Sequence, residues 1–227
     1  MKNKLLTTAL MAILCPGINA QTTFQKTYGG TGYDAAYDIQ YTLDSGYIIA
    51  GETNSFGDAS GDIYLIKVNN AGDTIWTRTF GLSGIYDYAI SATPTADSGY
   101  IICGASANKL LVIKINPSGD TLWTKSYGNT GNSDGFTIQQ TSDGGYIISG
   151  FTYTATMDTY LVKIDALGNI TWTKTYGGSS TAIGQLKGDM IQQTADGGYI
   201  LISQPGGTVL GNWDYSIVKT NSLGDTL

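Results

Sequence analysis

The chain has 227 residues, of which 41% are hydrophobic and 13% charged, and this balance excludes a mainly disordered protein. Its 31 glycines and 16 tyrosines, beside only 4 prolines, are typical of short strands joined by tight turns and argue against an all-helical fold. The net charge of −6 disfavours nucleic-acid binding, and the absence of histidine excludes His-based catalysis and most zinc or copper sites.

Residues 1–20 have the pattern of a secretory signal peptide. Lys2 and Lys4 form a basic start, residues 5–14 form an apolar stretch, and Ala20 precedes the expected cleavage before Gln21. The leader predicts a protein that is secreted or displayed at the cell surface. We expect no membrane span, because a spanning helix needs about 20 apolar residues and no stretch of the sequence reaches that length.

The two cysteines differ in their sequence context. Cys15 lies in the leader, and lipid attachment there would require a small residue before it, whereas Leu14 is large. Cys103 is the one cysteine after the leader, so no disulfide can form within the exported chain. The equivalent repeat positions carry Ala50 and Ser149, which predicts that Cys103 is a small core residue and not a nucleophile.

Residues 21–227 form one domain of internal repeats, with boundaries near 30–80, 81–128, 129–177 and 178–227. Three motifs recur in the same order. The first is Asp-x-Gly-Tyr-Ile followed by Ile or Leu, the second is an apolar run ending in lysine, and the third is Gly-Asp or Gly-Asn shortly before a tryptophan. The motif residues are Tyr47, Tyr100, Tyr146 and Tyr199, then Lys67, Lys114, Lys163 and Lys219, then Trp76, Trp123 and Trp172.

Each repeat contains four short strand-like segments. In the third repeat these lie near residues 134–141, 145–151, 158–165 and 170–176, and the intervening turns carry Asp-Gly and Leu-Gly-Asn. Glycine and asparagine tolerate the positive φ angles that hairpin turns require. Four antiparallel strands in a repeat of about 50 residues are typical of a propeller blade. The sequence therefore predicts an all-β fold, a β-propeller with about four blades.

The recurrent tryptophans Trp76, Trp123 and Trp172 are interpreted as docking residues that pack between blades. Aspartates Asp62, Asp158 and Asp214 each occur once per repeat, five residues before the recurrent lysine. We interpret them as strand-end caps, because a calcium site needs several oxygen ligands in one loop. No metal site and no cofactor is expected.

The two ends of the repeat array leave two arrangements open. Residues 221–227 match residues 116–122, after which Trp123 follows, and residues 23–29 match the strand that comes next, with Phe24 in the tryptophan position. Either the chain is the opening part of a larger propeller, or residues 23–29 supply a fourth strand and close a four-bladed ring. We favour the larger propeller, whose open blade edge predicts self-association.

The connections between strands predict where a ligand would bind. The nearly constant turns fall on one face of the propeller, because successive strands alternate in direction. The variable connections fall on the other face, where relaxed loops or a binding surface would both explain the variation. The candidate binding residues there are Phe56, Tyr86, Tyr153 and Trp213, and the alternative for each is local packing.

The combined consensus carries a family resemblance. Asp-x-Gly-Tyr-Ile-Ile-x-Gly, then Asp-x-Tyr-Leu-Ile-Lys, then Gly-Asp-x-x-Trp-Thr-Lys-Thr-Tyr-Gly-Gly resembles the propeller repeats of secreted and surface proteins of Bacteroidota-type bacteria and is similar to the SBBP class. The resemblance implies a display or interaction module that is not catalytic. Many such proteins end in a type IX sorting domain, and none is visible here.

Three functions are compatible with the sequence. The leading hypothesis is a non-enzymatic propeller that binds a glycan, a protein or a cell-surface component through the variable face. The rival is a secreted hydrolase or lyase with an Asp-based site in the mouth of the propeller, which would need a pair of carboxyl groups at a set separation. The third is a structural spacer in a larger surface protein.

Overall fold

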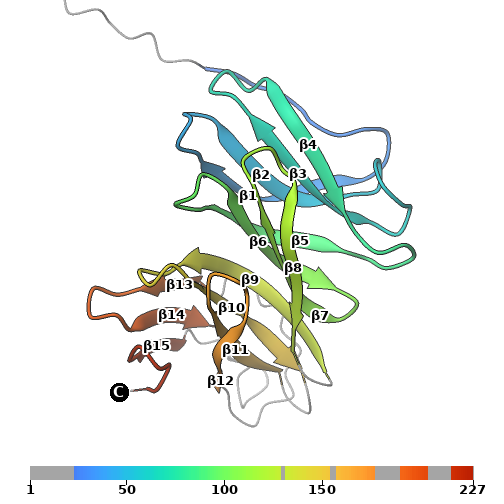
Figure 1. Cartoon of the computed structure of the whole chain (residues 1–227). Coiled ribbons are helices and arrows are strands. Elements are labelled where there is room, and N and C mark those ends of the chain that lie inside the picture. Colours follow the sequence, from blue (N-terminus) through green and yellow to red (C-terminus); the bar gives the residue numbers. More distant parts are fainter. Residues whose placement is uncertain (1–22, 129–130, 154–156, 177–189, 204–215, 227) are drawn as a thin grey trace, which may run out of the picture.

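A computed structural model describes residues 23–128, 131–153, 157–176, 190–203 and 216–226. The predicted signal peptide, residues 1–20, lies outside this range, as does Trp213. The described part of the chain contains fifteen strands and no helix, and therefore no helix that could span a membrane. Its antiparallel sheets follow one another along an open arc (Figure 1). The prediction of an all-β fold with propeller-type blades is confirmed.

The sheets are meanders in which sequential strands pair as neighbours. The first contains β1 (Asp34–Tyr41), β2 (Tyr47–Thr53), β3 (Asp62–Val68) and β4 (Thr74–Phe80). The second contains β5 (Tyr88–Pro94), β6 (Tyr100–Ser106), β7 (Lys109–Ile115) and β8 (Thr121–Tyr127). The third contains β9 (Asn132–Gln140), β10 (Tyr146–Tyr153), β11 (Met157–Ile164) and β12 (Ile170–Tyr176).

The fourth sheet contains β13 (Met190–Gln193), β14 (Tyr199–Ser203) and β15 (Ser216–Thr220). A single bridge from Thr220 to Thr226 continues it, at the position where the other sheets begin their fourth strand. Strands β1, β5, β9 and β13 contact one another in succession, so the first strand of each sheet is innermost. The fourth strands therefore form the outer edge of the arc.

A lysine ties the first hairpin turn of each blade to the third strand, and in the first three sheets it is buried. In the second sheet the Lys114 ammonium donates to Thr95 Oγ1 at 3.0 Å, to Asp97 Oδ1 at 3.0 Å and to the Ile115 carbonyl oxygen at 3.2 Å. Three donors thus meet three acceptors, which satisfies a charged group whose side chain is only 4% exposed. A Cβ at Gly99 would lie 2.4 Å from the Ile115 carbonyl oxygen, which explains the glycine in the turn motif.

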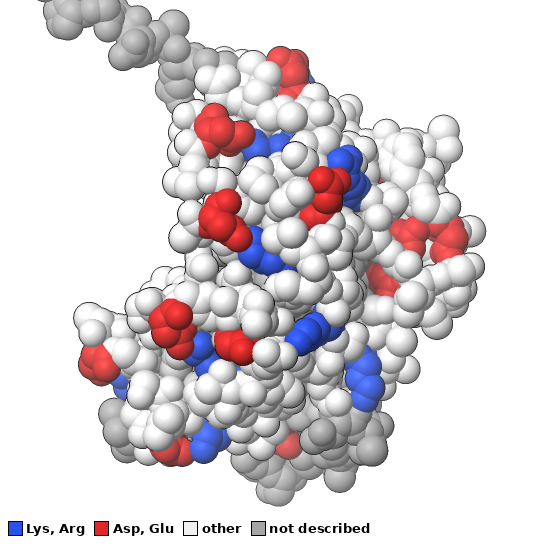
Figure 2. Space-filling view, in the orientation of Figure 1, with Lys and Arg blue, Asp and Glu red and all other residues white. Residues whose placement is uncertain are grey.

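The same ion pair occurs in every sheet. The nitrogen to oxygen distance is 2.9 Å for Lys67 and Asp44, 2.9 Å for Lys163 and Asp143, and 2.8 Å for Lys219 and Asp196. Acidic and basic side chains accordingly lie in neighbouring patches on the surface drawn in Figure 2. The recurrent lysine and the aspartate of the recurrent Asp-x-Gly motif are therefore the two partners of one ion pair that is present in every sheet.

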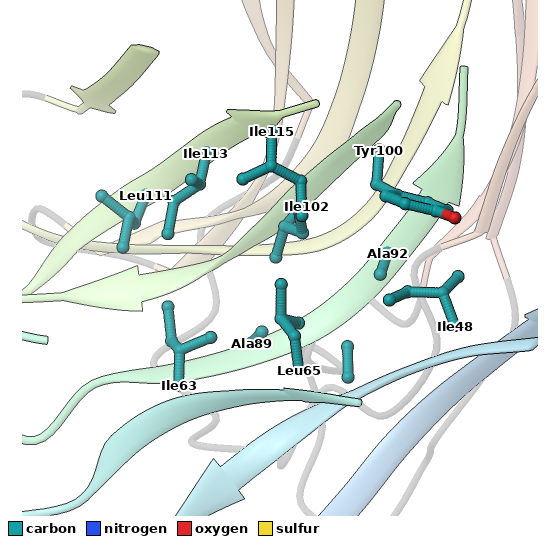
Figure 3. Packing of buried hydrophobic residues seen from close by; sticks show 11 residues of the cluster. Ile48, Ile63, Leu65, Ala89, Ala92, Tyr100, Ile102, Leu111, Ile113 and Ile115 are labelled. Atoms are coloured by element: carbon teal, nitrogen blue, oxygen red, sulfur yellow. The ribbon is translucent and has the colours of Figure 1, made fainter. Parts of the chain in front are cut away.

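Neighbouring sheets pack face to face through residues that recur at equivalent positions. We call the face that a sheet turns toward the next sheet its trailing face and the opposite one its leading face. Figure 3 shows the interface between the first and second sheets. The trailing face of the first sheet contributes Ile48, Ala50, Ile63 and Leu65, and the leading face of the second contributes Tyr100, Ile102, Leu111, Ile113 and Ile115. Cys103 is fully buried in the next interface, where its small side chain packs among apolar neighbours.

The recurrent tryptophans lie across these interfaces. Trp76 contacts Tyr100 of the next sheet edge to face, with ring centroids 6.1 Å apart, and its Nε1 donates to the Pro117 carbonyl oxygen at 3.1 Å. Trp123 contacts Tyr146 at 6.3 Å, and Trp172 contacts Tyr199 at 5.8 Å, in the same geometry. Each tryptophan therefore joins the fourth strand of one sheet to the second strand of the next.

Truncating a docking tryptophan should destabilise the protein. Trp123→Ala is expected to lower the free energy of unfolding by about 1 to 3 kcal/mol, less than the roughly 3 to 5 typical of a fully buried aromatic, because Trp123 is half-buried. Leu122→Ala is the matched control, since Leu122 is 56% exposed and should change stability by about 0.5 kcal/mol or less. Denaturant unfolding measures both, and equal losses would contradict the docking role.

The lysine ties also predict an acid-sensitive stability. Partial burial alone would raise the pKa of Asp97, but hydrogen bonds from Thr95 and Lys114 outweigh it and lower the pKa to about 2. The pKa of Asp143 is likewise lowered to about 2. A carboxyl with a lowered pKa stabilises the fold above its unfolded value of about 3.9, and this contribution is lost as the pH falls toward 2.

Denaturation midpoints measured between about pH 5 and pH 2 should therefore fall steeply in the unmodified protein. The Asp97→Asn, Asp143→Asn double variant should be less stable at pH 5 and show a shallower fall. An unchanged slope in the double variant would show that these carboxyl groups do not supply the effect.

Candidate functional site

A β-bulge on the innermost strand of the first sheet positions the candidate site. The register between β1 and β2 shifts between Ala36 and Asp38, so Tyr37 is the extra residue of β1. A Cβ at Gly51, opposite the bulge, would lie 1.8 Å from the Ala35 carbonyl oxygen, so only glycine permits this close approach. Bulges redirect side chains and are common beside functional sites.

Glu52 is buried where the first and second sheets meet and binds two tyrosines. Glu52 is only 2% exposed. The hydroxyl of Tyr37 donates to Glu52 Oε1, and the hydroxyl of Tyr86, from the connection between the first and second sheets, donates to Oε2. The rings themselves reach the surface: Tyr37 is 48% exposed, Tyr86 is 52% exposed, and the nearby Tyr33 is 62% exposed.

Electrostatics keep these tyrosines protonated. Burial raises the pKa of both Tyr37 and Tyr86, and the hydrogen bond to Glu52 and the charge of Glu52 raise it further. Each phenolic hydrogen is therefore held by Glu52, and the lone pairs of each phenolic oxygen remain as acceptors. A hydroxyl that donates to a carboxylate is polarised and becomes a stronger acceptor.

The cluster continues into the third sheet through Tyr88. The Tyr86 and Tyr88 rings lie 5.4 Å apart, and the Tyr88 hydroxyl donates to Asp134 Oδ2 on β9. Burial raises the pKa of the Asp134 carboxyl, and the Tyr88 hydrogen bond offsets this only in part. Two acidic side chains from the first and third sheets are thus linked by Tyr88 of the second sheet and by Tyr86 of the connection that precedes it. We call Tyr33, Tyr37, Glu52, Tyr86, Tyr88 and Asp134 the tyrosine–carboxylate cluster.

The cluster departs from the repeat. Glu52 follows the glycine that recurs in the second strands of the first three sheets, and the same position holds Ala105 in the second sheet and Phe151 in the third. The bulged position of Tyr37 holds Ile90 and Phe136, and the Phe136 and Phe151 rings contact each other at 5.6 Å. The third sheet therefore forms the same bulge with an apolar pair, Phe136 and Phe151, at these positions. The blade structure alone does not explain the polar pair, Tyr37 and Glu52, in the first sheet.

The three predicted binding residues that the structure describes, Phe56, Tyr86 and Tyr153, are not brought together. Tyr86 belongs to the cluster, whereas the Phe56 ring packs 5.2 Å from Tyr64 on the leading face of the first sheet. Tyr153 is 43% exposed at the end of β10, in the third sheet. Trp213 lies outside the described residues. Phe56 and Tyr86 thus occupy opposite faces of the first blade.

Sequence reasoning missed five members of the cluster: Tyr33, Tyr37, Glu52, Tyr88 and Asp134. One signal was present, because Glu52 is the single glutamate among 18 acidic residues and stands where the second and third repeats carry Ala105 and Phe151. Its tyrosine partner Tyr86 comes from the next blade, and that proximity depends on the fold. The described residues hold no group of three or more acidic or cysteine side chains arranged to bind a metal ion.

No protein-family model matches the sequence, and no curated protein is significantly similar to it. Solved structures do match. A protein of unknown function from Bacteroides caccae aligns with a TM-score of 0.55 and 13% identity over 86% of this chain, which spans 66% of that protein. An endo-arabinase from Bacteroides thetaiotaomicron aligns with a TM-score of 0.52 and 14% identity over 89% of this chain and 82% of that one. Such low identities show the fold alone, and they support a propeller-like architecture.

Proposed function

We propose that the protein is an exported β-propeller that binds a neutral carbohydrate at the tyrosine–carboxylate cluster. The observation that supports this is the combination of exposed tyrosine rings with phenolic oxygens polarised by a buried glutamate. A sugar ring has an apolar C–H face, which packs on aromatic rings, and a rim of hydroxyl donors, which match the phenolic acceptors. The leader pattern in residues 1–20 supports export.

The charge of the protein favours a neutral ligand over an acidic one. The net charge is −6, and Glu52 and Asp134 both lie within the cluster. An anionic sugar would place its carboxylate or sulfate near these acidic groups in a partly buried site, where repulsion is poorly screened. The acceptor-rich surface instead suits hydroxyl groups, which donate.

A glycan array followed by calorimetry tests the proposal. Neutral oligosaccharides should bind, and uronic-acid or sulfated ones should bind more weakly. For a bound glycan, Tyr33→Ala and Tyr86→Ala should each reduce affinity about tenfold or more, the scale of about 1.4 kcal/mol expected for loss of one stacking contact. Tyr86→Phe should lose less, because it keeps the ring and removes only the hydroxyl.

Tyr41→Ala is the matched control, because Tyr41 is 64% exposed at the last residue of β1, the strand that also carries Tyr37. Its affinity should stay within about twofold of the unmodified protein, which is within the usual effect of a surface change. Melting temperatures of all variants establish that each is folded. Preferential binding of acidic glycans, or equal losses in Tyr86→Ala and Tyr41→Ala, would contradict the proposal.

The raised pKa of Asp134 favours a second candidate, glycoside hydrolysis. A general acid must hold its proton near working pH, and burial favours the protonated form of Asp134. Glu52 would then act as the base or nucleophile. Release of reducing ends from a bound glycan, abolished separately by Asp134→Asn and Glu52→Gln, would establish this activity, and binding without release would favour the first candidate.

A further inference from the structure

Two carboxylates face each other where the first blade meets the second. Asp62 is the first residue of β3, and Asp87 lies directly before β5. A Cβ at Gly81 would lie 1.8 Å from Asp62 Oδ1 and 3.0 Å from Asp87 Oδ2, so these two oxygens are no more than 4.8 Å apart, the sum of the two distances. Asp62 is 6% exposed and Asp87 is 0% exposed. The chain therefore buries two acidic side chains close together, beside a glycine that leaves room for both.

Each carboxylate uses one oxygen to accept a hydrogen bond from the backbone. The Asp58 amide donates to Asp62 Oδ2 at 2.7 Å, and the Leu82 amide donates to Asp87 Oδ2 at 2.6 Å. Asp87 Oδ1 is buried and has no hydrogen-bond partner in the described part of the chain. No lysine or arginine among the described residues forms an ion pair with Asp62 or Asp87. Buried charges in proteins are paired or coordinate metals, so the two carboxylates need a positive partner that these side chains do not supply.

The second blade has a positive charge at the equivalent place. Lys109 begins β7 as Asp62 begins β3, and its Nζ donates at 3.3 Å to the carbonyl oxygen of Gly128, the glycine that follows the fourth strand. Ser133 takes the place of Asp87, because the amide of each donates to the carbonyl of the residue before the third strand. Its Oγ would lie 2.6 Å from a Cβ at Gly128. An ammonium and a hydroxyl thus stand where the first blade has two carboxylates, and a bound cation would restore the positive charge there.

We infer that Asp62 and Asp87 bind a calcium ion between the first and second blades. Calcium takes oxygen ligands at about 2.3 to 2.6 Å, so one ion can join two oxygens that are up to about 5 Å apart. Magnesium requires a near-ideal octahedron and keeps several waters, which a site formed by two buried side chains suits less well. Carbonyl oxygens and water would complete the coordination, because the described residues offer no group of three acidic side chains.

The two ligands come from different blades, and for this reason the sequence does not predict the site. Asp62 accepts the Asp58 amide, as expected of a strand-end cap, but that role uses only Oδ2. The ion would join the connection at residues 57–62 to the connection at residues 81–87. Tyr86 of the tyrosine–carboxylate cluster immediately precedes Asp87. Calcium binding here does not require the carbohydrate ligand proposed above.

Calorimetric titration of the unmodified protein with calcium chloride tests the site. With two carboxylates we expect a dissociation constant of about 0.1 to 1 mM, the range of extracellular calcium modules. Calcium at about 10 mM should raise the melting temperature by about 3 to 10 °C over protein in chelator, because a ligand that binds only the folded state stabilises it. Magnesium chloride at the same concentration should raise it by about half as much or less.

Asp87→Asn and Asp62→Asn each remove one charge while keeping the side-chain volume, and each should weaken calcium binding about tenfold or more. Without calcium, Asp87→Asn should be at least as stable as the unmodified protein, because it removes a buried charge that has no ion-pair partner. Asp120→Asn is the matched control, since the Asp120 side chain is 65% exposed in a turn of the second blade. Its calcium affinity should stay within about twofold of the unmodified protein.

Absence of calcium binding in the unmodified protein would overturn the inference and would favour a proton shared by the two carboxylates. An equal response to magnesium would also contradict it, as would unchanged calcium affinity in folded Asp62→Asn and Asp87→Asn. Circular dichroism establishes that each variant is folded. If a variant does not fold, the titration of the unmodified protein with the two metal salts still decides the outcome.

Discussion

The architecture depends on one lysine ion pair in each blade, and the lysine is buried in the first three sheets. A lysine ammonium removed from water must find acceptors for all three of its hydrogens, and in the second sheet Thr95, Asp97 and the Ile115 carbonyl provide them. This requirement fixes the first hairpin turn against the third strand, and it leaves no room for a side chain at Gly99. With each meander fixed in this way, the leading and trailing faces present the same residue positions in every blade, and the same interface can recur along the arc.

Because the blades share one pattern of residues, a position where one blade differs from the others indicates a role beyond folding. The blade needs only an apolar pair at the bulge, as Phe136 and Phe151 show, yet the first sheet places Tyr37 and Glu52 there. Burying an acidic side chain costs free energy unless it is hydrogen-bonded, and the second tyrosine partner comes from the adjacent blade. The blade structure does not require a buried acid at this position, and the ligand binding proposed above would account for both the acid and the exposed rings around it.

Local signals in the sequence predict the strands and turns of the blades well and the tyrosine–carboxylate cluster poorly. Strand patterning and turn chemistry place the third-repeat strands within a few residues of their observed bounds, because glycine and aspartate act within one hairpin. The pairing of Lys114 with Asp97 escaped prediction although both recur, since the motif alone does not show that one side chain reaches across the sheet to the other. Phe56 and Tyr86 belong to similar variable connections, but they lie on opposite faces of the first blade, which only the three-dimensional packing reveals.

The claim that the buried lysine holds each blade is tested most directly by hydrogen exchange in Lys114→Met, with Lys125→Met on the adjacent outer strand as the control. Methionine keeps most of the side-chain volume and removes the three donors, so amides of the turn at residues 95–99 should exchange faster and the free energy of unfolding should fall by about 1 to 3 kcal/mol. Lys125→Met should leave that turn unchanged. Equal exchange at residues 95–99 in Lys114→Met and in the unmodified protein would contradict the account.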